Sequence, residues 1–288
     1  MRKVPAVTFH FWAVKILSTA IGEALSDYLV HTISPYEAVG LGFIGFVIAL
    51  VWQFAMRKYF APAYWLAVVM VAVFGTMVAD ALHIEMGIPY ATSAFDCAVA
   101  LAAIFAIWYI VERTLSIDSI NSPRREAFYW ATVLATFAMG TALGDLSSYT
   151  WHLGWFVSGL LFTALYATPL VAKRVAGLRS VGAGSASLTG LSRNWLVAFW
   201  WAYILTRPLG ASYADWLGVP PSLGGLNFGR GRVAIALTLV IIAWVAYLTV
   251  SRVDVEARPK TLGERFGDPG GPDPGEATSS GASASVDA

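Results

Sequence analysis

Among the acidic side chains that lie inside apolar stretches of this chain of 288 residues, five are the first candidates for chemistry: Glu23, Asp27, Asp80, Asp145 and Asp215. A charged side chain at the centre of a bilayer costs about 2.5 to 3.5 kcal/mol on insertion scales, so it needs a partner or a hydrated cavity. Carboxylates in such a setting bind protons or hard and borderline cations such as Mg²⁺ and Mn²⁺. The five residues therefore suggest a site that binds or conducts a small cation.

The four aspartates occupy the same place in a pattern that occurs four times. Each copy has an aromatic residue before Trp, then nine residues, Gly, four residues and Asp. The tryptophans and glycines are Trp12 and Gly22, Trp65 and Gly75, Trp130 and Gly140, and Trp200 and Gly210. Identical offsets in segments rich in Ala, Val, Leu and Phe indicate an internal repeat.

The first copy carries Lys15, Thr19 and Glu23, which the others lack, and these residues are candidates for ion binding and transport. A helix at 100° per residue places Lys15, Thr19, Glu23 and Asp27 within one arc of about 140°, and this stripe must face protein or water. Glu23 and Asp27 repel each other unless a proton or a cation lies between them. In the fourth copy Arg207, a further candidate for the ion-binding path, takes the position of Thr19. We expect it to neutralise a neighbouring aspartate, and the alternative is that it binds an anion.

The glycines and tryptophans suggest how the copies are held together. Each glycine is followed four residues later by a second small residue, a spacing that lets two helix backbones approach closely. We therefore expect the glycine faces to form the contacts between repeats. Tryptophan is enriched at membrane interfaces, so the four tryptophans are predicted to be interfacial anchors at the cytoplasmic side. The aspartates then lie at one similar depth, where they could form a ring or only accept structural hydrogen bonds.

Two histidines are weaker candidates. His83, three residues beyond Asp80, and His152 could join a carboxylate site for a transition metal or a proton relay, or could be ordinary interfacial histidines. The sequence contains no nucleophile elbow, P-loop or H-E-x-x-H pattern. A function other than catalysis is favoured, and no particular cofactor is indicated.

The composition requires a membrane setting for these residues. Hydrophobic residues make up 57% and charged residues 13% of the chain, against about 25% charged residues in soluble domains. The net charge of +1 gives no reason to expect nucleic acid as a partner. One cysteine, Cys97, excludes an intramolecular disulfide.

Eight apolar segments have about the 20 residues that cross a bilayer. They cover residues 9–31, 38–56, 63–83, 93–112, 127–148, 152–172, 195–216 and 232–250. With alternating orientation, fifteen of the nineteen Lys and Arg residues fall on the side of both termini. Since Lys and Arg are enriched in cytoplasmic loops, both termini are predicted to be cytoplasmic.

These segments predict an all-α, polytopic protein of four tandem, parallel two-helix repeats. Because each repeat holds two spans, all four have the same orientation in the membrane. The membrane domain is predicted over residues 1–255, with repeats at about 8–60, 61–122, 123–180 and 191–252. Residues 256–288 are rich in Pro, Gly, Asp, Ser and Ala and are predicted to be a disordered cytoplasmic tail.

The repeated residues resemble a bacterial family of four tandem two-helix membrane repeats, each with a characteristic tryptophan, known as domain of unknown function 347. The first copy, Ser18-Thr19-Ala20-Ile21-Gly22-Glu23-Ala24-Leu25-Ser26-Asp27-Tyr28, is similar to the fullest motif of that family. The later copies depart from the motif because they lack the glutamate and usually the threonine. The resemblance covers about residues 8–252 and implies the fold and a bacterial inner-membrane location, without an activity.

The sequence as a whole predicts a multi-pass membrane protein that moves a divalent metal ion or a proton along its intramembrane carboxylates. The alternative is a membrane scaffold or sensor that transports nothing and in which the aspartates are structural.

Overall fold

The computed structural model describes residues 2–84, 86–180 and 188–255. Within these residues the chain forms eight α-helices and no β-strand, so the all-α prediction is confirmed. The helices are α1 (Phe9–Thr32), α2 (Pro35–Ala55), α3 (Ala61–Ile84), α4 (Tyr90–Glu112), α5 (Pro123–Asp145), α6 (Gly154–Ser180), α7 (Leu188–Gly218) and α8 (Arg230–Ser251). Each predicted span overlaps one of them. The predicted tail, residues 256–288, lies outside the described residues.

Local sequence signals explain several helix ends. Ser34 caps α2 through a capping box with Glu37, and Pro35 follows at the first helical position, where the missing N–H is no loss. Ser122 caps α5 in a similar way by accepting a hydrogen bond from the Arg125 N–H. The helices therefore begin where short polar residues and proline interrupt the apolar runs.

Among the described residues, six helices are long and apolar enough to cross a membrane: α2, α3, α4, α5, α6 and α8. This fits a multi-pass membrane protein in contact with the lipid bilayer. Their burial differs, since no more than 22% of the apolar stretch is buried in α2, α4, α6 and α8, against 67% in α3 and 61% in α5. The two remaining helices, α1 and α7, carry the charged residues Lys15, Glu23, Asp27, Arg207 and Asp215.

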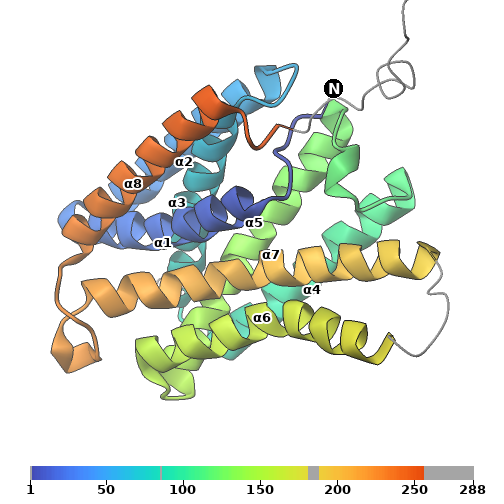
Figure 1. Ribbon diagram of the computed structural model, residues 1–288. Coiled ribbons are helices and arrows are strands. Elements are labelled where there is room, and N and C mark those ends of the chain that lie inside the picture. The colour runs from blue at the N-terminus through green and yellow to red at the C-terminus, as the bar shows by residue number, and fades with distance from the viewer. Residues whose placement is uncertain (1, 85, 181–187, 256–288) are drawn as a thin grey trace, which may run out of the picture. The chain divides into compact units, whose positions relative to one another are not determined.

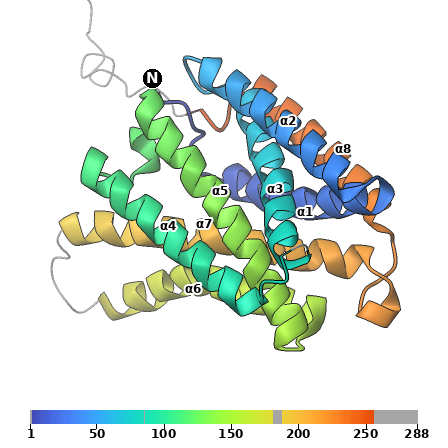
Figure 2. The same ribbon diagram turned by 180° about the vertical axis from the view of Figure 1, so that it is seen from behind.

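The four helices that carry the repeated pattern form a closed inner ring. In this ring α1 packs on α3, α3 on α5, α5 on α7, and α7 again on α1. Each plainer helix packs mainly on the next member of the ring: α2 on α3, α4 on α5, α6 on α7 and α8 on α1. In both views α2 and α8 lie on one side of the inner helices, and α4 and α6 on the other (Figures 1 and 2). The Trp-Gly-Asp pattern thus lies on the buried helices.

Candidate functional site

The glycine of each inner helix lies against the next helix of the ring. A Cβ atom added to any of the four would overlap a residue of that helix, and the pairs are Gly22 with Ala72, Gly75 with Phe137, Gly140 with Arg207 and Gly210 with Thr19. Each of these partners stands three residues before the glycine of its own repeat. The Thr19 hydroxyl also donates a hydrogen bond of 3.0 Å to the Thr206 carbonyl of α7. The close contacts therefore follow the same geometry around the ring.

These crossings bring the predicted carboxylates together. One carboxylate oxygen from each of Glu23, Asp27 and Asp215 lies within 4.8 Å of the others. Asp80 and Asp145 are close enough to Glu23 to interact electrostatically with it. The acidic cluster, as we call these five residues, receives side chains from all four inner helices.

Arg207 lies beside the acidic cluster and is fully buried, at 0% exposed. Its guanidinium forms a salt bridge of 2.5 Å with Glu23 and donates a 2.7 Å hydrogen bond to the Thr141 hydroxyl. It also donates to the hydroxyl of Thr76. Three repeats therefore each supply one acceptor to the arginine of the fourth.

The prediction that Arg207 would neutralise an aspartate is wrong, because its salt bridge is formed with Glu23. Glu23, Thr76 and Thr141 each directly follow the glycine of their repeat, whereas the aspartate stands five residues beyond that glycine. The side-chain stem of Arg207 packs against Gly140. Its guanidinium therefore lies at the same height along the ring as the residues that directly follow the glycines. It therefore lies about one helical turn short of the aspartates.

A second arginine reaches the cluster from the last helix. Arg230, the first residue of α8, forms a salt bridge of 2.7 Å with Asp27. The two side chains remain 28% and 18% exposed, so this end of the cluster is partly open. In the described part of the chain, Asp80, Asp145 and Asp215 have no side-chain hydrogen bond or salt bridge. Five carboxylates thus share two guanidinium partners, which leaves three negative charges in excess when all are ionised.

Lys15 lies between two aromatic rings. In the repeated pattern its position is nearer to the tryptophan than that of Arg207, and therefore farther from the aspartate. Its ammonium is 4.0 Å from the ring centre of Phe137 and 4.4 Å from that of Tyr203, and the residue is 1% exposed. No salt bridge to Lys15 occurs among the described residues. The ammonium group is stabilised by cation–π attraction to the negative faces of these two rings.

Aromatic residues fill the ring beyond Lys15, at the level of the tryptophans. The Tyr64 and Tyr129 hydroxyls are 2.5 Å apart, and those of Tyr129 and Tyr203 are 3.3 Å apart. Trp65, Trp130 and Trp200 are buried here against protein, while Trp12 is partly exposed. Their depth in a bilayer, and with it the role of interfacial anchors, stays a prediction.

The N-terminal segment covers this end of the ring. Lys3 forms a buried salt bridge of 2.6 Å with Glu126, and Gln53 donates a 3.0 Å hydrogen bond to the same carboxylate. Nearby, the Tyr59 hydroxyl donates to Asp254, and burial together with this carboxylate raises the pKa of Tyr59. We call this the Trp end and the acidic cluster the Asp end. The Trp end is closed by packed side chains.

The two histidines lie outside the group of carboxylates that could hold a metal ion. The ring nitrogens of His83 are 2.8 Å from the Ile88 carbonyl and 3.0 Å from the Ser93 hydroxyl. His152 is exposed between α5 and α6 and has a φ of 55°. Among the described residues the candidate metal group consists of Glu23, Asp27 and Asp215.

Sequence reasoning missed the partners of the charged residues. Thr76 and Thr141 align with Glu23, but their role appears only when Arg207 lies between them. Arg230 lies outside the repeated pattern, at the start of the last helix. The sequence indicated only that it lies at the same end of the helices as the aspartates. The Lys3–Glu126 pair joins residues 123 positions apart and left no local signal.

Comparison with known families gives one match. The model described as Repeat of Unknown Function (DUF347) matches residues 10–59, 63–114 and 198–254, which together make up more than half of the chain. The comparisons with curated proteins and with solved structures gave no match. The matched segments include the patterns that end at Asp27, Asp80 and Asp215. The chain therefore belongs to the family of the Repeat of Unknown Function (DUF347).

Proposed function

We propose that the chain is a bundle of eight spans, built from four tandem two-helix repeats of the same orientation around one axis. Two observations support this arrangement: the inner ring closes from α7 to α1, and each glycine meets the equivalent position of the next helix. The basic residues favour an inner-membrane orientation with the Trp end on the cytoplasmic side, and the acidic cluster on the opposite side.

We propose further that this protein binds a small cation, a divalent metal ion or a proton, at the acidic cluster and moves it along the axis. The observation that carries this proposal is a group of three carboxylates within 4.8 Å of one another, with two more that interact with them electrostatically, against only two guanidinium partners. In a setting with few hydrogen-bond partners, three uncompensated charges strongly favour uptake of cations or protons.

The spacing of the oxygens suits a divalent ion. Mg²⁺ binds oxygen ligands at about 2.0 to 2.1 Å in octahedral geometry, which places neighbouring ligands about 3 Å apart and opposite ligands about 4.2 Å apart. The oxygens of Glu23, Asp27 and Asp215 lie within 4.8 Å of one another, so small side-chain movements could bring them to these distances. Water and the two other aspartates would complete the ligand set.

The closed Trp end implies a change of conformation during transport. The tyrosine hydroxyls and the Lys3–Glu126 pair fill the axis there, whereas Asp27 and Arg230 are partly exposed at the Asp end. We infer that this conformation admits the ion from the Asp end only. Release at the Trp end then requires the tyrosine rings to separate.

Uptake into liposomes tests the transport proposal. The purified chain is reconstituted with either a Mn²⁺-quenched dye or a pH-sensitive dye inside the vesicles. We expect Asp215→Asn to lower the initial rate of Mn²⁺ or proton entry at least tenfold, because it removes a ligand that has no arginine partner. Asp96→Asn, a matched change of an exposed aspartate on α4, should leave the rate within twofold. Unchanged entry of both ions in Asp215→Asn would refute the carboxylate mechanism.

One observation favours the alternative of a non-transporting scaffold or sensor. The fully buried Arg207 network and the close glycine contacts show that polar and small residues also hold the helices together. If the aspartates are only structural, Asp→Asn at any of the four copies should lower the thermal stability by a similar amount, and wild-type vesicles should take up neither ion. Transport by the wild type with a loss confined to cluster variants would reject this alternative.

A further inference from the structure

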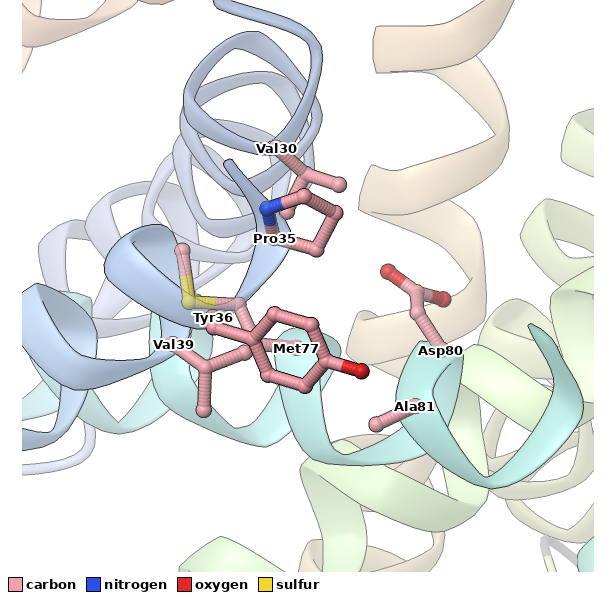
Figure 3. A pocket seen from close by; sticks show the side chains of 7 residues that line it. All are labelled: Val30, Pro35, Tyr36, Val39, Met77, Asp80 and Ala81. Carbon is pink, nitrogen blue, oxygen red and sulfur yellow. The ribbon is translucent and has the colours of Figure 1, made fainter. Parts of the chain in front are cut away.

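A pocket of about 220 Å³ opens beside the acidic cluster, between α1, α2 and α3. Val30 of α1, Met77 and Ala81 of α3, and Pro35 and Val39 of α2 form apolar walls. Tyr36 of α2 adds an aromatic ring that is 79% exposed. Figure 3 shows these side chains around the pocket. The pocket lies near the turn that joins α1 to α2, so we place its mouth at the predicted extracytoplasmic side.

Among the described residues that line this pocket, Asp80 is the one that carries a charge. In Figure 3 its carboxylate lies at one end of the pocket, on the same side as the Tyr36 hydroxyl. Within the described chain no side chain donates a hydrogen bond or forms a salt bridge to it. Glu23, Asp27 and Asp145 act on Asp80 electrostatically and add negative potential behind it, and the more distant Arg207 offsets part of that potential. The pocket therefore combines an apolar chamber with a carboxylate that has no direct partner among the described residues.

We propose that this pocket binds a small organic ammonium ion that carries an apolar body. The carboxylate of Asp80 would pair with the ammonium group, and the face of the Tyr36 ring would contact it, as aromatic faces do in ammonium recognition. Val30, Val39 and Met77 would hold the apolar body.

The volume limits the size of this ligand. An engineered apolar cavity of about 150 Å³ accommodates benzene, so about 220 Å³ holds one ring with a short aminoalkyl chain. A hydrated metal ion would leave the apolar walls without a partner. This inference does not rest on the transport proposal, because the pocket can bind an amine whether or not the chain moves ions.

Ligand-detected NMR with the full chain in nanodiscs tests the inference, and empty discs correct for partitioning into lipid. The probes are 2-phenylethylammonium and its neutral analogue 2-phenylethanol. We expect the ammonium ion to bind at least tenfold more tightly than the alcohol. Asp80→Asn should reduce this ratio to less than threefold. Equal affinity for the two probes in the wild type would overturn the inference and indicate a general apolar site.

A second pair of variants separates a filled pocket from a misfolded protein. Val39→Phe fills the pocket and retains all carboxylates, so the ammonium ion should bind at least tenfold more weakly. Val47→Phe makes the same change at an exposed position of α2 outside the pocket and should stay within twofold of the wild type. Wild-type affinity in Val39→Phe, or equal losses in both variants, would place the amine elsewhere and refute the proposed site. Uptake of Mn²⁺ and protons by Val39→Phe should remain at the wild-type rate, which keeps the two proposals separable.

Discussion

Replacement of Arg207 by methionine tests whether the buried ion pair holds the inner ring together. The guanidinium of Arg207 is fully buried and reaches Glu23 at 2.5 Å and Thr141 at 2.7 Å. Methionine fills part of the same space without a charge. The change leaves Glu23 unpaired beside Asp27 and Asp215, whose carboxylate oxygens lie within 4.8 Å of its own.

The expected magnitude follows from this arrangement. Removal of one partner of a buried ion pair costs about 3 to 5 kcal/mol, because the remaining charge is uncompensated. Glu23→Gln keeps an acceptor for Arg207 and should cost less, about 1.5 to 3 kcal/mol, the value of a hydrogen bond to a charged group. Once the arginine is absent, the same glutamine removes an unpaired charge. The double variant should therefore lie within about 1 kcal/mol of Arg207→Met, a coupling of about 2 kcal/mol.

Unfolding by SDS in mixed micelles, followed by circular dichroism, measures these free energies. Arg232→Met is the matched control, since this arginine is exposed at the start of α8, and surface changes usually remain within about 0.5 kcal/mol. Additive losses in the double variant, within about 0.5 kcal/mol, would refute the reasoning that Arg207 acts through Glu23.

Two further changes test the packing of the ring. Gly140→Ala places a methyl group against the side-chain stem of Arg207, so we expect a loss of about 1 to 3 kcal/mol from overpacking. Gly40→Ala meets nothing within 4 Å and should gain up to about 1 kcal/mol of helix propensity; losses of equal size would contradict the close contact at Gly140. Lys15→Met should leave the stability within about 1 kcal/mol or raise it, because it replaces a buried unpaired charge with an apolar chain of similar length. A loss above about 2 kcal/mol in the same SDS titration would show that the ammonium itself is stabilising.

The helices and the candidate carboxylates were predictable because their signals are local. Apolar runs of membrane length, bounded by Ser34-Pro35 and Ser122-Pro123, predict where helices lie. The fixed offset from Trp to Gly to Asp predicts that equivalent residues have equivalent places. Both kinds of signal are contained in about 25 consecutive residues, so no knowledge of the partner helix is needed.

The partners of the charged residues were not predictable in the same way. The sequence placed Lys15, Glu23 and Asp27 on one helical face, but it contained nothing to direct Lys15 to the rings of Phe137 and Tyr203 rather than to a carboxylate. The ring of four helices decides this, because Phe137 of α5 and Tyr203 of α7 occupy the space beside Lys15 of α1.

The sequence by itself determined that the chain crosses a membrane, repeats one pattern and carries carboxylates at equivalent positions. Only the tertiary structure decided that Glu23, rather than an aspartate, pairs with Arg207, and that Asp80 faces both the cluster and an apolar pocket. The physical reason is that composition and periodicity describe a single helix. Charge pairing depends instead on which residues of neighbouring helices lie at the same height. The relative heights of the helices are set by the close glycine contacts between segments that are far apart in the chain.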